Sequence, residues 1–305
     1  MIAPAFPDDG RGTVVTVGSF DGVHRGHRSV LQEIARRAQR GHRRSVLVTF
    51  EPHPMEIVNP QAAPLLLTLS AERREVLAQS ELDGVMFLAF TPELARATPG
   101  EFVRMLLDRL HLAELVIGFD HGFGRGRAGD VGVLEQLGRE LGFRVDVVPA
   151  VTIDGRPVSS TLIRRAVAGG DLETAAKFLG RHYAMTGTVV HGAGRGRGLG
   201  YRTINLAPPE RRKLLPPDGI YAVKVEWPGG AAGGMMHQGP RPTFNEAERT
   251  LEIHLFDTDL DLYGQSVKVM WVTRLRDVLS FPTPDALRAQ LDKDFTAAHA
   301  ALTAC

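Results

Sequence analysis

The chain has 305 residues, of which 43% are hydrophobic and 23% are charged, and its formal net charge is +1. This length favours two domains, and the composition is typical of a globular protein. The near-neutral charge argues against a broad nucleic-acid-binding surface. The longest apolar run, residues 85–90, suits a buried strand and is too short to cross a membrane.

The positions of cysteine and lysine exclude further classes of protein. The only cysteine is Cys305, so no internal disulfide can form. Residues 1–11 lack a basic stretch followed by an apolar one, so we expect no signal peptide and a cytoplasmic location. No lysine precedes Lys177 and no Gly-Lys pair occurs, which excludes a Walker A loop.

In the first half of the chain, short apolar strands alternate with helices. Strands are expected at 14–17, 45–50, 85–90, 115–118 and 144–148, and helices at 29–40, 70–79, 99–110 and 131–141. This alternation predicts a doubly wound parallel sheet of the α/β class, with ligands at the carboxyl ends of the strands. Thr98, Pro99 and Glu101 have the spacing of a capping box that starts one of these helices.

Residues 18–27, Gly-Ser-Phe-Asp-Gly-Val-His-Arg-Gly-His, join the first strand to the first helix. His24 and His27 therefore lie at a helix N-terminus, where free N–H groups and the helix dipole favour anions. Gly26 lets the backbone approach a phosphate, and imidazoles can donate hydrogen bonds to its oxygens. The segment predicts a nucleotide-phosphate site, and a turn with two surface histidines is the alternative.

Two later segments of the first half are further candidates for anion binding. Residues 118–129, rich in glycine and arginine, follow a strand and suit a loop wrapped against phosphates or a base, although an ordinary solvated loop has the same composition. Ser159, Ser160 and Thr161 precede Arg164 at the start of a helix expected at 160–168. Their hydroxyls cap this helix, bind a second anion, or do both. Another helix is expected at 171–179, and we place the domain boundary near residue 181.

After residue 182 the pattern is that of an antiparallel barrel or sandwich. Strands are expected at 186–190, 219–227, 249–257 and 266–273, without helices between them. Within residues 251–255, Glu252 and His254 share one face and the apolar residues share the other. A final helix starts at Pro284, and its apolar stripe should dock on the barrel: Leu287, Leu291, Phe295, Ala298 and Leu302.

Residues 191–200 have glycine at every other position from 192 to 200, with Arg195 and Arg197 between them. A flexible segment that carries arginine suits a lid over phosphates. An RNA-binding Arg-Gly segment is the competing interpretation, which a single short copy and a near-zero net charge disfavour.

Taken in order, these segments resemble the prokaryotic bifunctional riboflavin kinase/FMN adenylyltransferases over essentially the whole chain. His-x-Gly-His at 24–27, with Phe-Asp-Gly-Val before it, is similar to the nucleotidylyltransferase signature of that family. Residues 50–54, 118–124 and 159–164 resemble other motifs of the same half. His121 departs from the pattern, because this loop usually carries phenylalanine there.

For the first half, the resemblance implies that the FMN phosphate attacks the α-phosphorus of ATP and that pyrophosphate leaves, with Mg²⁺ assisting. It assigns catalytic roles to His24, His27 and Arg164. The residues expected to bind the nucleotide are Gly18, Phe20, Asp21, Gly26, Asp120, Arg127, Ser159, Ser160 and Thr161.

For the second half, the resemblance to flavokinases implies that Thr203 and Asn205 hold Mg²⁺ and the ATP phosphates, next to Gly192, Arg195 and Arg197. Glu252 matches the general base that acts on the ribityl hydroxyl of riboflavin, whereas strand alternation alone favours a solvated surface glutamate. The sequence departs from the family at Arg202 and Ile204, which replace proline and alanine. It departs again at His237 and Gln238, where an asparagine and an apolar residue are common.

The expected protein is thus a two-domain cytoplasmic transferase, with an FMN adenylyltransferase domain at 1–181 and a riboflavin kinase barrel at 182–305. Riboflavin, FMN and ATP are its expected small-molecule substrates, FMN and FAD its product ligands, and neither nucleic acid nor membrane is an expected partner. A weak homo-oligomer is compatible with the sequence. Two alternatives stay open: an adenylyltransferase whose degenerate kinase module only binds flavin, and a non-enzymatic flavin-sensing regulator.

Overall fold

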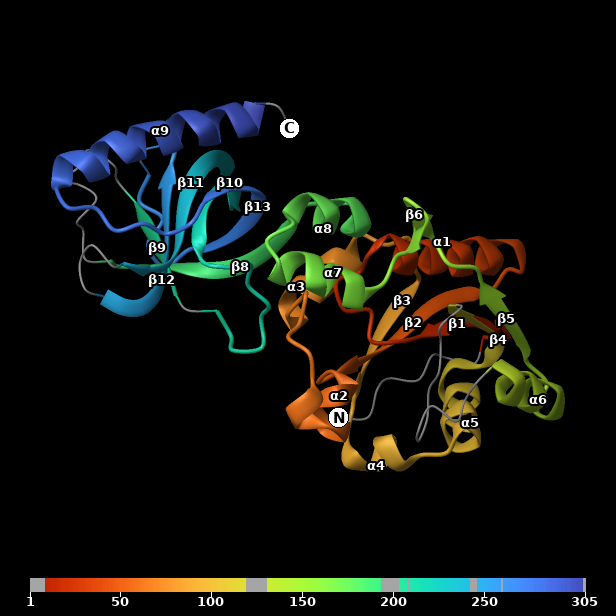
Figure 1. Cartoon of the computed structure of the whole chain (residues 1–305). Helices are drawn as coiled ribbons and strands as arrows, with labels where there is room; N and C mark the ends of the chain where they lie inside the picture. The colour runs from red at the N-terminus through yellow and green to blue at the C-terminus, as the bar shows by residue number, and fades with distance from the viewer. Residues whose placement is uncertain are drawn as a thin grey trace. The chain divides into compact units, whose positions relative to one another are not determined.

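The chain folds into two compact units, Met1–Ser160 and Thr161–Cys305 (Figure 1). A computed structural model describes residues 9–118, 131–192, 203–207, 209–241, 246–258 and 260–303, with the side chains of 241 and 246–248 left aside. In these ranges, no helix has the length and apolar character needed to cross a membrane.

The first unit is built on a parallel sheet with the strand order β3-β2-β1-β4-β5. The strands are β1 (Thr13–Val17), β2 (Arg44–Glu51), β3 (Gly84–Ala89), β4 (Leu112–Gly118) and β5 (Arg144–Val148). This confirms the predicted doubly wound sheet. Because β2 lies on one side of β1 and β4 on the other, the strand order reverses between β1 and β4. Sheets of this kind bind ligands at the carboxyl ends of the two strands where the order reverses.

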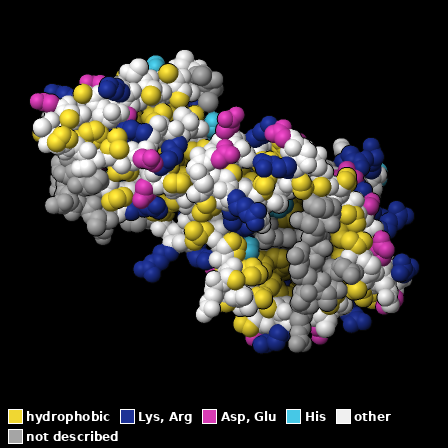
Figure 2. Space-filling model, viewed as in Figure 1, with side chains coloured by type: hydrophobic (Ala, Val, Ile, Leu, Met, Phe, Trp, Pro, Cys, Tyr) yellow, Lys and Arg dark blue, Asp and Glu magenta, His cyan; other side chains and the backbone are white. Residues whose placement is uncertain are grey.

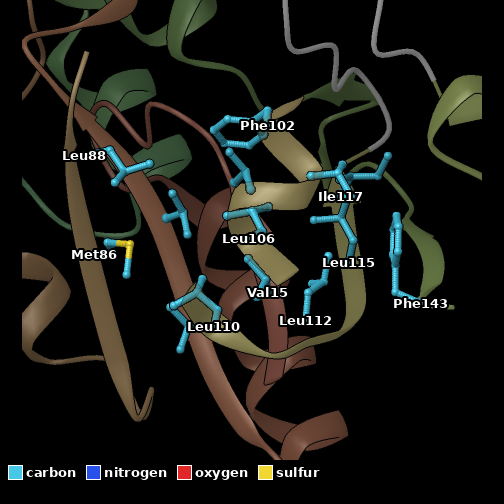
Figure 3. Packing of buried hydrophobic residues seen from close by; sticks show 14 of the residues in the cluster. Val15, Met86, Leu88, Phe102, Leu106, Leu110, Leu112, Leu115, Ile117 and Phe143 are labelled. Atoms are coloured by element: carbon cyan, nitrogen blue, oxygen red, sulfur yellow. The ribbon is translucent and has the colours of Figure 1, made fainter. Parts of the chain in front are cut away.

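Helices cover both faces of this sheet (Figure 1). On one face, α1 (Arg25–Arg40) and α3 (Ser70–Ala78) bury Ile34 and Leu77 against strand residues such as Leu47. On the other, α5 (Pro99–Leu110) and α6 (Val131–Leu141) bury side chains such as Leu106, which lies close to Val15 and Leu115 in Figure 3. Thr98 and Glu101 form the predicted capping box.

The elements that the sequence analysis did not predict in this unit are all short. They are α2 (Pro54–Val58), the 3-10 helix η1 (Pro60–Ala62), α4 (Pro92–Arg96), β6 (Thr152–Ile153) and β7 (Arg156–Pro157). A segment of two to five residues is too short for a hydrophobic period to become visible.

In the second unit, the helices α7 and α8 precede a closed antiparallel barrel with the order β10-β11-β12-β9-β8-β13, and a third helix follows it. The helices α7 (Ser160–Ala168) and α8 (Leu172–Leu179) lie where they were expected. The barrel strands are β8 (Tyr183–Val190), β9 (Ile204–Leu206), β10 (Gly219–Trp227), β11 (Gly230–Arg241), β12 (Glu246–Leu255) and β13 (Ser266–Arg276). The structure thus decides between the barrel and the sandwich, and it adds β9 and β11, which were not predicted.

The terminal helix α9 (Pro284–Thr303) packs along the outside of the barrel (Figure 1). Ala298 is buried against Ile220, Met235 and Phe256, and Leu291, Phe295 and Leu302 pack around them. Four of the five predicted stripe residues therefore belong to this cluster.

On the molecular face in Figure 2, basic and acidic side chains are interspersed, as the near-neutral net charge leads one to expect.

Candidate active sites

The loop between β1 and α1 has an unusual backbone. Phe20, Gly22 and Val23 have φ values of 49°, 81° and 38°. Glycine tolerates this region, whereas a β-branched residue such as Val23 is strained there, at a cost of about 1–3 kcal/mol. The rest of the unit must hold the loop in this shape.

Asp21 is one of the groups that hold the loop. It is 1% exposed, and its carboxylate accepts hydrogen bonds from the backbone N–H groups of Leu67 and Thr68, both at 2.9 Å, and from the Thr68 hydroxyl at 3.1 Å. The Thr68 hydroxyl in turn accepts from the backbone N–H of Gly22 at 2.9 Å. Asp21 therefore shapes the loop, and its direct contact with a nucleotide stays a prediction.

Arg73 of α3 holds the loop from another side. Its guanidinium donates to the carbonyl oxygens of Ser19 at 2.8 Å and Phe50 at 2.7 Å, and burial lowers its pKa. The Ser160 hydroxyl donates to the carbonyl oxygen of Asp21 at 2.9 Å. The sequence analysis missed Thr68 and Arg73, because no motif marks them and their partners lie far away in the sequence.

The two histidines stack on each other at the start of α1. Their ring centroids are 3.6 Å apart with an interplanar angle of 13°, and the ring of Phe20 stacks on His27 at 4.4 Å. His24 is the N-cap residue, and its Nδ1 accepts a hydrogen bond from the backbone N–H of His27 at 3.2 Å. A neutral His24 therefore carries its proton on Nε2, which is the nitrogen able to donate to a ligand.

Gly26 makes this arrangement of His24 sterically accessible. A Cβ atom at position 26 would lie 3.2 Å from both Cε1 and Nδ1 of His24. A side chain at this position would force the imidazole to shift by a few tenths of an ångström. The loop thus presents N–H donors at a helix N-terminus beside the crevice of the sheet, which is a site suited to phosphate.

The other predicted residues of this half fall into three groups. Gly18 belongs to the loop, where a Cβ atom would lie 3.0 Å from the Phe20 ring. Ser159 directly precedes α7, whereas Thr161 and Arg164 lie within α7 in the second unit, so their contact with the phosphate site stays a prediction. Asp120 and Arg127 lie outside the described residues.

In the second unit, the predicted kinase residues meet on the outer face of the barrel. Leu251 and Ile253 are buried in the barrel, so Glu252 between them faces outward, as does His254, which confirms the predicted alternation. Glu252 pairs with Asn205 of β9, and Oε1 of Glu252 accepts a hydrogen bond from the Thr203 hydroxyl at 2.7 Å.

Gly192 packs directly against this group. A Cβ atom at position 192 would lie 2.1 Å from the amide nitrogen of Asn205, so any larger residue would displace the Asn205 side chain. Ile204, which departs from the family, pairs with Ile253 of β12. Arg195, Arg197 and Arg202 lie outside the described residues.

The oxygen groups at Thr203, Asn205 and Glu252 are chemically suited to a hard cation such as Mg²⁺. Within the described ranges, no cluster of three or more His, Cys, Asp or Glu residues could hold a metal ion by itself. A cation at this site would therefore depend on the hydroxyl, the amide and the phosphates of a bound nucleotide.

Comparisons with known proteins match each half of the chain to a family model. The family model for FAD synthetase matches residues 6–162, and the family model for riboflavin kinase matches residues 179–302. The bifunctional riboflavin kinase/FMN adenylyltransferase of Escherichia coli K12 is 36% identical over 285 residues, which cover 93% of this chain and 90% of the relative. The chain belongs to this bifunctional family.

Other members and a solved structure extend this likeness. The bifunctional riboflavin kinase/FMN adenylyltransferase of Pseudomonas fluorescens is 38% identical over 293 residues and is covered to 93% of its length. A crystal structure from Streptococcus pneumoniae, titled as a macrolide-efflux protein, has a TM-score of 0.86 and 32% identity, and the match covers 97% of this chain and 95% of that one. The bifunctional family thus accounts for both units of the chain.

Proposed function

We propose that the chain phosphorylates riboflavin to FMN in the second unit and adenylylates FMN to FAD in the first. The observation that carries this proposal is that each unit matches one of the two family models and gathers a separate set of polar groups suited to its reaction. The substrates are riboflavin, FMN and ATP, and the composition favours a cytoplasmic enzyme without nucleic acid as a partner.

The adenylyl transfer needs no nucleophile from the protein. A phosphate oxygen of FMN forms a bond to the α-phosphorus of ATP, and the bond between that phosphorus and the pyrophosphate oxygen breaks. The N–H groups of His24 and His27 stabilise charge on the transferring and leaving oxygens, while Asp21 and Arg73 keep the loop in place. Arg164, with Ser159 and Thr161, supplies a second set of anion contacts.

The phosphoryl transfer needs a base. The ribityl hydroxyl of riboflavin forms a bond to the γ-phosphorus of ATP, its proton moves to the carboxylate of Glu252, and ADP leaves. The hydrogen bond from Thr203 to Oε1 fixes one side of that carboxylate. The Thr203 hydroxyl and the amide oxygen of Asn205 would hold Mg²⁺, which, when bound, neutralises charge on the phosphates.

Separating the products formed from riboflavin, ATP and Mg²⁺ by chromatography tests the proposal. A bifunctional enzyme makes FMN first and FAD afterwards. An adenylyltransferase with a degenerate kinase module makes FAD only when FMN is supplied, and a flavin-sensing regulator makes neither product.

Two variants assign the reactions to the two sites. His27→Ala should lower kcat/KM for FAD formation at least about 10-fold, because one transition-state donor is lost, and it should spare FMN formation. Glu252→Gln should reduce FMN formation to a residual rate that only single-turnover measurements resolve, and it should spare FAD formation from supplied FMN. Unchanged FAD formation by His27→Ala would refute the role of the histidine.

A further inference from the structure

A row of residues runs across three strands of the barrel at Glu252. His237 of β11 lies directly opposite Glu252, and Asn205 of β9 lies directly opposite it on the other side. Residues that face each other in antiparallel strands have Cβ atoms about 4.5–5.5 Å apart and point to the same side of the sheet. The imidazole and the carboxylate are therefore neighbours on the outer face of the barrel.

The direction of the His237 side chain is fixed by the next residue. Gln238 is fully buried, and its amide nitrogen donates to the carbonyl oxygens of Pro216 at 2.6 Å and Pro217 at 3.1 Å. Met236 on the other side of His237 is also fully buried. Because neighbouring side chains of a strand point to opposite faces, the inward anchors at 236 and 238 turn His237 outward.

The surroundings of His237 are asymmetric. Its neighbour on β10 is Ile220, an apolar residue that is buried under α9, whereas its neighbour on β12 is Glu252. Of the two residues that lie directly opposite His237 on the neighbouring strands, only Glu252 has a side chain that can accept a hydrogen bond. Thr203 already donates to Oε1 of that carboxylate from the strand beyond.

We propose that His237 is a positioning residue for Glu252: its N–H group donates to the carboxylate from the β11 side and, with Thr203, fixes the carboxylate plane toward the hydroxyl of riboflavin. This inference rests on the proposed role of Glu252 as the base.

Two substitutions at position 237 distinguish the effect of losing the hydrogen-bond donor from the effect of losing side-chain volume. His237→Phe keeps a ring and removes the donor, so it should lower kcat for FMN formation about 10-fold, as expected for the loss of one hydrogen bond to a carboxylate. KM for riboflavin and for ATP should stay within about 2-fold, because the effect is on orientation and not on binding. His237→Asn restores a donor and should stay within about 3-fold of the wild-type kcat.

FAD formation from supplied FMN, measured on the same preparations, is the internal control and should not change in either variant. Wild-type kcat in His237→Phe would overturn the inference. An equal loss of kcat in His237→Phe and His237→Asn, together with a lower unfolding midpoint in both, would also overturn it, because it would indicate a purely structural role.

A double variant separates this inference from the proposed function. If His237 acts through Glu252, Glu252→Gln with His237→Phe should form FMN no more slowly in single turnovers than Glu252→Gln alone. Additive losses would overturn the inference. Wild-type FMN formation by Glu252→Gln alone would instead refute the proposed base, whereas a silent Glu252→Gln beside a fully active His237→Phe would refute only the role of His237.

Discussion

Val23 adopts a left-handed backbone conformation that a β-branched side chain normally avoids, and it lies next to the N-cap histidine of the proposed phosphate site. The cost of this strain is offset by hydrogen bonds that remote residues make to the same loop. Thr68 and Arg73 make most of them, and both are buried. The His-x-Gly-His spacing could be predicted from sequence, whereas these anchors could not, because only the fold brings residue 73 beside residue 19.

A prediction at the residue scale concerns Gly26. In Gly26→Ala, the new Cβ atom would lie 3.2 Å from the His24 ring and would shift the ring by a few tenths of an ångström. Because this shift weakens the N-cap hydrogen bond and misplaces the donor, kcat/KM for FAD formation should fall about 10-fold, with FMN formation unchanged.

Gly100→Ala is the matched control for Gly26→Ala. It is the same substitution in α5 of the same unit, but its Cβ atom would meet Leu137 at an ordinary 3.8 Å. Full activity in Gly26→Ala, or equal losses in the two variants, would contradict the steric argument.

A second residue-scale prediction concerns the buried amide of Gln238. Gln238→Met has a similar shape but cannot donate to the carbonyl oxygens of Pro216 and Pro217, of which the second also accepts from the Tyr221 hydroxyl. One buried carbonyl then lacks its donor, so the free energy of unfolding should fall by about 1–2 kcal/mol.

Denaturant unfolding followed by tryptophan fluorescence measures the effect of Gln238→Met, because both tryptophans, Trp227 and Trp271, lie in the second unit. An unchanged or higher stability would show that the amide contributes little.

At the scale of secondary-structure elements, those with a clear hydrophobic period could be predicted from the sequence. The helix at 131–141 and the strands at 144–148 and 219–227 have the predicted bounds.

The strand β11 was not predicted because it contains several glycines and Pro240, and these residue types are rare in strands. The structure explains two of these glycines. A Cβ atom at 233 would lie 2.8 Å from Leu302 of α9, and one at 234 would lie 2.7 Å from the carbonyl oxygen of His254. Because β11 was missed, the position of His237 directly opposite Glu252 was missed as well.

A prediction at this scale concerns the charge pairs of α1. Hydrogen bonds from Arg36 and Arg37 hold the pKa of Glu33 at about 2, below the usual 4.5, against the opposing effect of partial burial. A lowered carboxyl pKa stabilises the folded state above pH 4.5 and loses this contribution as the pH falls toward 2. Because the pair is partly exposed, the contribution should stay below about 1 kcal/mol.

Glu33→Gln should therefore lower the heat stability of FAD formation slightly at pH 7, and the difference from wild type should shrink between pH 4.5 and pH 3. The measurement is the midpoint of heat inactivation at each pH, at low and at high salt. A difference that grows on acidification would contradict the assigned pKa shift.

At the scale of the whole molecule, the two units have separate hydrophobic cores, and the structure and the sequence place the boundary between them differently. The structure divides the chain after Ser160, whereas the sequence favours a boundary near 181. The two family matches leave residues 163–178 between them, and these form most of α7 and α8. Two glycines, residues 169 and 170, separate these helices. The sequence around them therefore does not show to which domain each helix belongs. In the structure, α8 packs against β8 and β13 of the barrel.

Phe178→Ala tests where this segment belongs. Phe178 is 1% exposed in α8, and its truncation should cost about 3–5 kcal/mol of the stability of the unit that contains it. If α8 is part of the barrel unit, the tryptophan unfolding transition shifts to lower denaturant and the heat stability of FMN formation falls, while FAD formation keeps its inactivation midpoint. Leu106→Ala, in the core of the first unit, should give the reverse pattern. A loss of heat stability confined to FAD formation in Phe178→Ala would place α8 in the first domain and the boundary near residue 181.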